Sequence, residues 1–148
     1  MHRGILLLIA LVAAQGQGKV EYMGGTVAQI AEGTQGTIDV SDDHYLAFYP
    51  SKAPKKGPMR IAYSSVNLVE YGQQVDRRLA LAVVSPLFLL SKSRKHFLTI
   101  GYSGEDGQQQ ALVFRVDKNG IRATLVALEA RTGQKIQYQD EEARKAGK

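Results

Sequence analysis

Short runs of β-branched and aromatic residues, separated by glycine, serine and aspartate, fill most of the chain after residue 20. Such runs, bounded by turn-forming residues, are typical of strands joined in hairpins. The clearest hairpin lies late in the chain, where residues 96–102 and 110–116 flank a turn rich in Gly and Asp. Because side chains alternate along a strand, each run places three apolar residues on one face. We assign both sets to the core: Leu98, Ile100 and Tyr102, and Leu112, Phe114 and Val116.

Earlier runs of the same kind occupy residues 25–30, 36–40, 44–49, 59–63 and 66–71. In the third of them, alternation places His44, Leu46 and Phe48 on a common face. Three prolines lie between residues 50 and 58. Proline has no backbone donor for a sheet, so this segment is expected to be an exposed loop.

The periodicity changes after residue 116. Ile121, Leu125 and Leu128 recur with helical spacing, polar residues 117–119 offer N-caps, and Gly133 follows. This pattern predicts one amphipathic helix of about 13 residues. A short extended piece is expected at 134–138, and the mixed-charge residues 139–148 are expected to form a flexible tail.

Three segments together resemble a known domain family: Ile-Ala-Tyr-Ser-Ser-Val-Asn-Leu-Val-Glu at 61–70, the hairpin 97–116 and the helix 121–131. They are similar to bacterial pleckstrin-homology-like domains, which are related to GRAM domains, and the resemblance covers most of residues 20–135. It implies a mainly β (β+α) fold, in which an antiparallel curled sheet or barrel of six to seven strands is closed by one C-terminal amphipathic helix.

The resemblance also implies a binding module for lipids or peptides, and no enzyme. Lipid-binding members usually carry basic residues in the loop between the first two strands. Here that loop, 31–35, contains Glu32 and neither Lys nor Arg. This departure argues against phosphoinositide-type recognition.

The N-terminus has the pattern of a secretory signal. His2 and Arg3 precede the apolar run 4–14, and small and polar residues follow. The run is shorter than the roughly 20 apolar residues that span a bilayer; a buried strand or helix is the alternative. We therefore expect a signal peptide at 1–16, one domain at 20–138, and export to the periplasm or the extracellular space.

A second apolar run, 79–90, lies between basic residues, and no acidic residue occurs from 77 to 104. As a helix this run would be apolar on almost every side, and it is too short to cross a bilayer. Two interpretations remain open. The run is either a buried helix or strand inserted between core strands, or a segment that enters the membrane interface while its basic flanks contact anionic headgroups. A protein-docking surface is a third possibility.

Basic charge is concentrated around this run. Residues 52–95 contain nine basic and two acidic residues, a local excess of +7, whereas the whole chain has a formal charge of +5. Each cation near an anionic membrane contributes on the order of 1 kcal/mol. The expected partner is an anionic membrane surface or an envelope protein. The expected binding surface comprises Arg77, Arg78, Leu87, Phe88, Leu89, Lys92, Arg94 and Lys95.

Few residues point to catalysis. The chain has no cysteine, His44 and His96 stand in no metal-ligand spacing, and no Gly-x-Ser-x-Gly occurs. We therefore expect no enzymatic activity, no metal and no cofactor, and export argues against a nucleic-acid partner. The alternative is a small-ligand carrier or hydrolytic enzyme that uses the barrel interior, which a closed apolar cavity lined by both histidines would favour. The sequence makes no prediction about oligomeric state.

Overall fold

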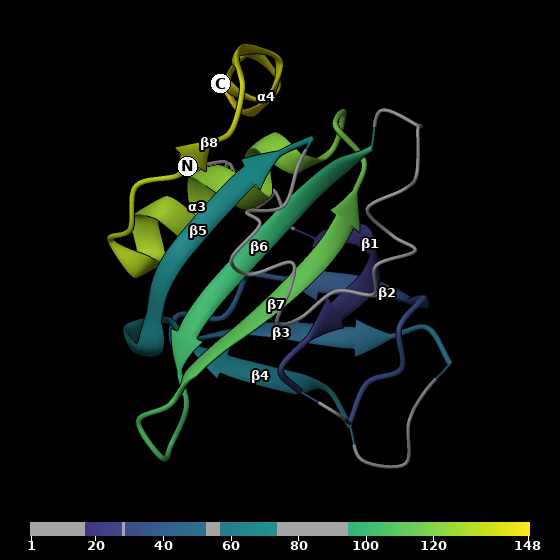
Figure 1. The fold of residues 1–148 in the computed structure, drawn as a ribbon, viewed down its shortest axis with the longest axis vertical. Coiled ribbons are helices and arrows are strands. Elements are labelled where there is room, and N and C mark those ends of the chain that lie inside the picture. The colour runs from purple at the N-terminus through teal and green to yellow at the C-terminus, as the bar shows by residue number, and fades with distance from the viewer. Residues whose placement is uncertain (1–16, 28, 53–56, 74–94) are drawn as a thin grey trace, which may run out of the picture.

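The computed structural model describes residues 17–27, 29–52, 57–73 and 95–148 (Figure 1). The strands are β1 (Gln17–Gly25), β2 (Thr34–Asp39), β3 (Tyr45–Pro50), β4 (Met59–Ala62), β5 (Val66–Gly72), β6 (His96–Ser103), β7 (Gln109–Val116) and β8 (Gln137–Tyr138). A 3-10 turn, η1 (Tyr63–Ser65), joins β4 to β5, and the helices are α3 (Ile121–Thr132) and α4 (Glu141–Gly147).

These strands form one mixed sheet in the order β4-β3-β2-β1-β7-β6-β5-β8. Only β8 is parallel to its neighbour, pairing Gln137 with Glu70 and Tyr138 with Tyr71. The mainly β prediction is confirmed, but the sheet has eight strands instead of six or seven and is not closed into a barrel. Its two edges are β4 and β8.

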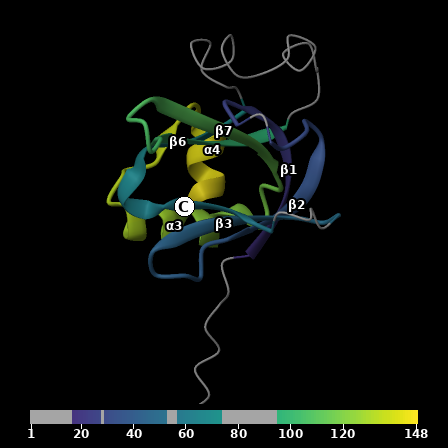
Figure 2. The ribbon, with the colours of Figure 1, turned by 90° about the horizontal axis from the view of Figure 1, so that it is seen from below.

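The sheet bends so that β2–β4 cross the direction of β5–β7, and the two halves face each other around the core (Figures 1 and 2). The ring centroids of Phe48 on β3 and Phe114 on β7 lie 5.3 Å apart. Between β1 and β7 the register shifts at Tyr22/Gly24, and such a bulge increases the local bend of a strand. The predicted core faces of β6 and β7 are buried, except that Tyr102 is half-buried.

Helix α3 packs against β1, β5 and η1. The predicted stripe is confirmed, since Ile121, Leu125 and Leu128 are buried. Gly133 ends the helix with a left-handed φ of 72°, and its N–H donates to the carbonyl of Glu129 at 3.0 Å. The prediction that one of residues 117–119 caps the start of α3 is wrong.

Gly120 precedes α3 without a side-chain cap. Asp117 instead accepts a hydrogen bond from the N–H of Asn119 at 2.9 Å and so forms a local turn before the helix.

Residues 139–148, where a flexible tail is expected, contain α4. Asp140 caps this helix by accepting from the N–H of Ala143 at 2.7 Å, and Ala143 itself is buried. Only small residues of α4 reach the interior, so the segment has no stripe of large apolar residues to reveal it.

Several predictions concern residues outside the described part of the chain. They are the signal peptide at 1–16 and the residues Arg77, Arg78, Leu87, Phe88, Leu89, Lys92 and Arg94 of the expected binding surface. Among the described residues, no helix has the length and apolar character needed to span a membrane.

Candidate functional site

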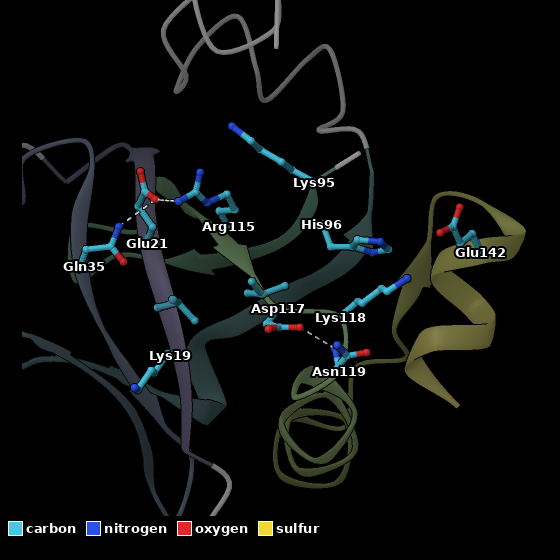
Figure 3. A pocket seen from close by; sticks show the side chains of 12 residues that line it. Lys19, Glu21, Gln35, Lys95, His96, Arg115, Asp117, Lys118, Asn119 and Glu142 are labelled. Carbon is cyan, nitrogen blue, oxygen red and sulfur yellow. Dashed lines mark hydrogen bonds and ion pairs between the residues drawn. The ribbon is translucent and has the colours of Figure 1, made fainter. Parts of the chain in front are cut away.

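Lys95 is the one residue of the expected binding surface that the structure describes, and it lines a cleft of about 510 Å³ (Figure 3). Strands β1, β2, β6 and β7 supply most of the lining, together with the β7–α3 loop and α4. The charged residues of the lining are Lys19, Glu21, Lys95, Arg115, Asp117, Lys118 and Glu142.

The cleft lies beside the point where residues 74–94 join the fold. Strand β5 ends at Gly72, β6 begins at His96, and Gly72 pairs with Phe97. Because the two strands are antiparallel neighbours, the end of β5 and the start of β6 lie side by side at one end of the sheet. Lys95 and His96, at the point of return, both line the cleft.

One wall of the cleft is an ion pair between Arg115 on β7 and Glu21 on β1. The two residues are direct partners in the β1–β7 register, and Gln35 Nε2 donates to the same carboxylate at 2.9 Å. The charge of Arg115 is therefore largely neutralised. Lys95 and Lys118 have no such ion pair within the described residues, so their charges remain available to an anionic partner.

His96, which lines the cleft, is paired with a second buried ring, that of Tyr71. His96 is 5% exposed, its Nδ1 lies 2.9 Å from the hydroxyl oxygen of Tyr71, and the two rings are stacked. Burial raises the pKa of Tyr71 to about 12, so the phenol is neutral and can donate to Nδ1. In that arrangement Nδ1 of His96 is the acceptor. His96 is thus held in place by Tyr71.

Helix α4 fastens the end of β5 beside this pair. Gln73 donates through its N–H to Asp140 Oδ2 at 3.2 Å and through Nε2 to Glu142 Oε2 at 2.6 Å. The N–H of Gln139 donates to the carbonyl of Tyr71 at 3.1 Å. The last described residues before position 74 are therefore anchored by hydrogen bonds to the C-terminal segment.

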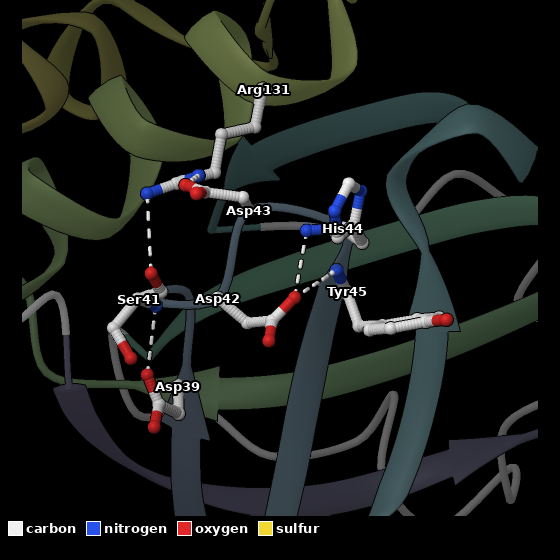
Figure 4. Close-up of polar contacts among 7 residues, drawn as sticks. All are labelled: Asp39, Ser41, Asp42, Asp43, His44, Tyr45 and Arg131. Carbon is white, nitrogen blue, oxygen red and sulfur yellow. Dashed lines mark hydrogen bonds and ion pairs between the residues drawn. The ribbon is translucent and has the colours of Figure 1, made fainter.

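His44 belongs to a different pocket, of about 430 Å³, with Asp43, Tyr63 and Arg131. Arg131 Nη1 donates to Asp43 Oδ1 at 2.8 Å and Nη2 to the carbonyl of Ser41 at 3.3 Å (Figure 4). His44 is exposed, whereas His96 is buried. The two histidines therefore do not line a common cavity.

The loop between β2 and β3 follows ordinary turn chemistry. Asp42 Oδ1 accepts from the N–H groups of His44 and Tyr45 at 2.7 and 3.0 Å (Figure 4). Since both bonds favour the ionised carboxylate, they hold the pKa of Asp42 below its ordinary value. Among the described residues, no three His, Asp or Glu side chains are placed to hold a metal ion.

Sequence reasoning missed two pairs at this site: Glu21 with Arg115 in the cleft, and Tyr71 with the cleft residue His96. Each joins residues far apart in the chain, so only the sheet register brings the partners together. A scan of family models and a search of curated proteins find nothing that matches this chain.

Proposed function

We propose that this protein is an exported, non-enzymatic binding module that docks on an anionic membrane surface through residues 77–95. The observation that carries the proposal is the position of Lys95, which lines the cleft beside the end of β5 and the start of β6. Lys95 is the last basic residue of the segment in the sequence, and the cleft that it lines also contains Lys19 and Lys118.

The physical basis is a combination of charge and apolar area. Arg77, Arg78, Lys92, Arg94 and Lys95 contribute on the order of 1 kcal/mol each near an anionic surface. The run 79–90 adds about 0.8 kcal/mol for each CH₂ group that enters the interface. Salt screens the first contribution, so binding is expected to weaken as ionic strength rises.

The filled interior supports surface binding over a ligand carrier. Phe48, Phe114, Leu98 and Leu112 occupy the space between the two halves of the sheet, each with an exposure of 1% or less. The described pockets that contain His44 and His96 lie at separate places on the surface. The pleckstrin-homology-like architecture is part of the proposal; a bent sheet with a C-terminal helix packed on β1 and β5 supports it.

The test is co-sedimentation of the purified full chain with vesicles of phosphatidylglycerol and phosphatidylcholine, and with vesicles of phosphatidylcholine alone. Leu87→Asp with Phe88→Asp is expected to abolish sedimentation with the anionic vesicles. The control is Ser64→Asp with Gln108→Asp, at two exposed positions. It adds the same negative charge elsewhere and is expected to leave sedimentation with the anionic vesicles unchanged. Residues 1–16 are common to all variants, so they do not affect the comparison.

A second pair of variants isolates charge. Lys92→Glu with Arg94→Glu is expected to weaken anionic-vesicle binding at least tenfold, while Arg144→Glu with Lys145→Glu, in exposed positions of α4, changes it little. Circular dichroism checks that each variant is folded. Absence of sedimentation by the unaltered chain would overturn the proposal in favour of an envelope-protein partner, and unfolding of the Leu87/Phe88 variant would place the run in the core.

A further inference from the structure

The outer face of α3 is apolar, opposite the face that packs on the sheet. Val126 is 59% exposed, Ala123 and Ala130 are exposed, and Ala127 is half-buried. These positions are spaced i, i+3, i+4 and i+7, so they lie along one side of the helix. Among the described residues, Val126 is the most exposed of the large apolar side chains, so most of this helix face is uncovered.

One flank of this face carries two opposite charges. Arg122 and Glu129 are exposed and seven residues apart, so they lie on the same side of α3 about 10 Å apart along its axis. This separation is too great for them to pair with each other. Neither forms an ion pair with another described residue. The flank of α3 therefore has a positive end and a negative end, and Lys135 and Lys148 line the same pocket as Arg122 and Glu129.

We propose that the outer face of α3 is a self-association surface, on which α3 of a second copy packs in the antiparallel direction. The positions follow a heptad, with Ala123 and Ala130 at a, Val126 at d, and Arg122 and Glu129 at g. Small side chains at a allow the helix axes to approach to about 8 Å, the lower end of the usual range.

Charge complementarity selects the direction. In an antiparallel pair related by a two-fold axis, the g flank of one helix faces the g flank of the other. Because the two helices run in opposite directions, each Arg122 lies opposite Glu129 of the second copy. In a parallel pair, the g flank faces the e flank of the other helix. That flank contains Ala127 and Gly120, which offer no charge. Only the antiparallel arrangement forms two ion pairs.

The small area of this helix face limits the affinity of the dimer. A stable interface buries roughly 800 Å² on each partner, and one helix face of 12 residues provides less. We therefore expect a concentration-dependent dimer with a dissociation constant on the order of 100 µM. This association uses residues 122–130 of α3, and the proposal does not depend on membrane docking.

The test is sedimentation velocity of the full chain from about 10 µM to 1 mM. Arg122→Glu gives two acidic groups on the flank and Glu129→Arg gives two basic ones, so each variant alone is expected to dimerise at least fivefold more weakly. An equimolar mixture of the two variants is expected to regain the lost association, because each introduced charge then faces its opposite. The double variant in one chain is expected to regain it as well.

A cysteine provides an independent readout, because the natural chain contains none. Val126→Cys, near the two-fold axis, is expected to form a disulfide-linked dimer under mild oxidation, whereas Gln108→Cys, exposed on the β6–β7 turn, is expected to form far less. Two results would overturn the proposal: a monomer at all concentrations, or single charge reversals that associate as strongly as the unaltered chain.

Discussion

Helices α3 and α4 contact each other and the same strand β5, but they are held by different interactions. Helix α3 buries Ile121, Leu125 and Leu128 and has no side-chain N-cap. Helix α4 buries only Ala143 and Gly147 but is capped by Asp140.

A tyrosine lies beside each helix, and the two hydroxyls differ in whether they form a hydrogen bond. Tyr63, beneath α3, has Arg131 5.7 Å from its ring centroid, and its buried hydroxyl forms no hydrogen bond within the described residues. Tyr71, beside α4, bonds to His96. The α3 side therefore depends on apolar burial and the α4 side on hydrogen bonds. Burial of large side chains contributes more free energy than exposed hydrogen bonds, so α4 is expected to open at a lower cost than α3.

The largest effect should come from the core of α3. Leu128→Ala removes a fully buried side chain and is expected to lower the free energy of unfolding by about 2–5 kcal/mol, because it leaves a cavity. Urea denaturation at about 5 µM measures this loss. Val126→Ala, on the exposed face of the same helix, is expected to change it by less than about 0.5 kcal/mol. Equal effects at the two positions would mean that α3 is not held by its inner face.

The two tyrosines test the polar side of the contrast. Tyr71→Phe is expected to cost about 1–3 kcal/mol, because the buried Nδ1 of His96 loses its hydrogen-bond partner. Tyr63→Phe removes a buried hydroxyl with no bond to any described residue and is expected to be neutral or stabilising. The same denaturation curves measure both. If Tyr63→Phe lowers the free energy of unfolding more than Tyr71→Phe does, then the α3 side, and not the α4 side, depends on a tyrosine hydrogen bond.

The contrast also explains which elements could be predicted. Leu125 and Leu128 produce a helical period that is visible in the sequence, so α3 could be predicted almost to its ends. Ala143 and Gly147 are too small to produce such a period, so α4 was missed. Strand β8 lies within the short extended piece expected at 134–138. The mainly β class was predictable because hairpin strands carry their pattern locally.

The candidate site was less predictable, for a related reason. Lys95 could be named because it belongs to a local cluster of charge. Its neighbours in the cleft come from β1, β7 and α4, and Glu21 meets Arg115 across a bulged register that no local pattern encodes. The apolar face of α3 was also missed, since Ala residues between large buried ones contribute little to a hydrophobic stripe.

A smaller effect is expected at the cap of α4. Asp140→Ala removes the bond to the N–H of Ala143 and the bond from the N–H of Gln73, and should cost about 0.5–2 kcal/mol. Hydrogen exchange should show faster exchange at Ala143 and Arg144, while Leu128 remains protected. Asp140→Asn keeps a capping oxygen and serves as the control. Equal acceleration in both helices would show that α3 and α4 open as one unit.

The smallest effect concerns the uncapped start of α3. Gly120 has a φ of −107°, which other residues adopt without strain, and a methyl group there would contact nothing within 4 Å. Gly120→Ala is therefore expected to raise the free energy of unfolding by about 0.4–1 kcal/mol, because it restricts the unfolded chain. Gly133→Ala is the matched opposite at the other end of the helix: its φ of 72° suits glycine, so the same methyl group should destabilise by more than this gain. If Gly120→Ala destabilises instead, the backbone at the start of α3 does not have this conformation. The stability of α3, like that of α4, would then depend on the hydrogen bonds of its first turn.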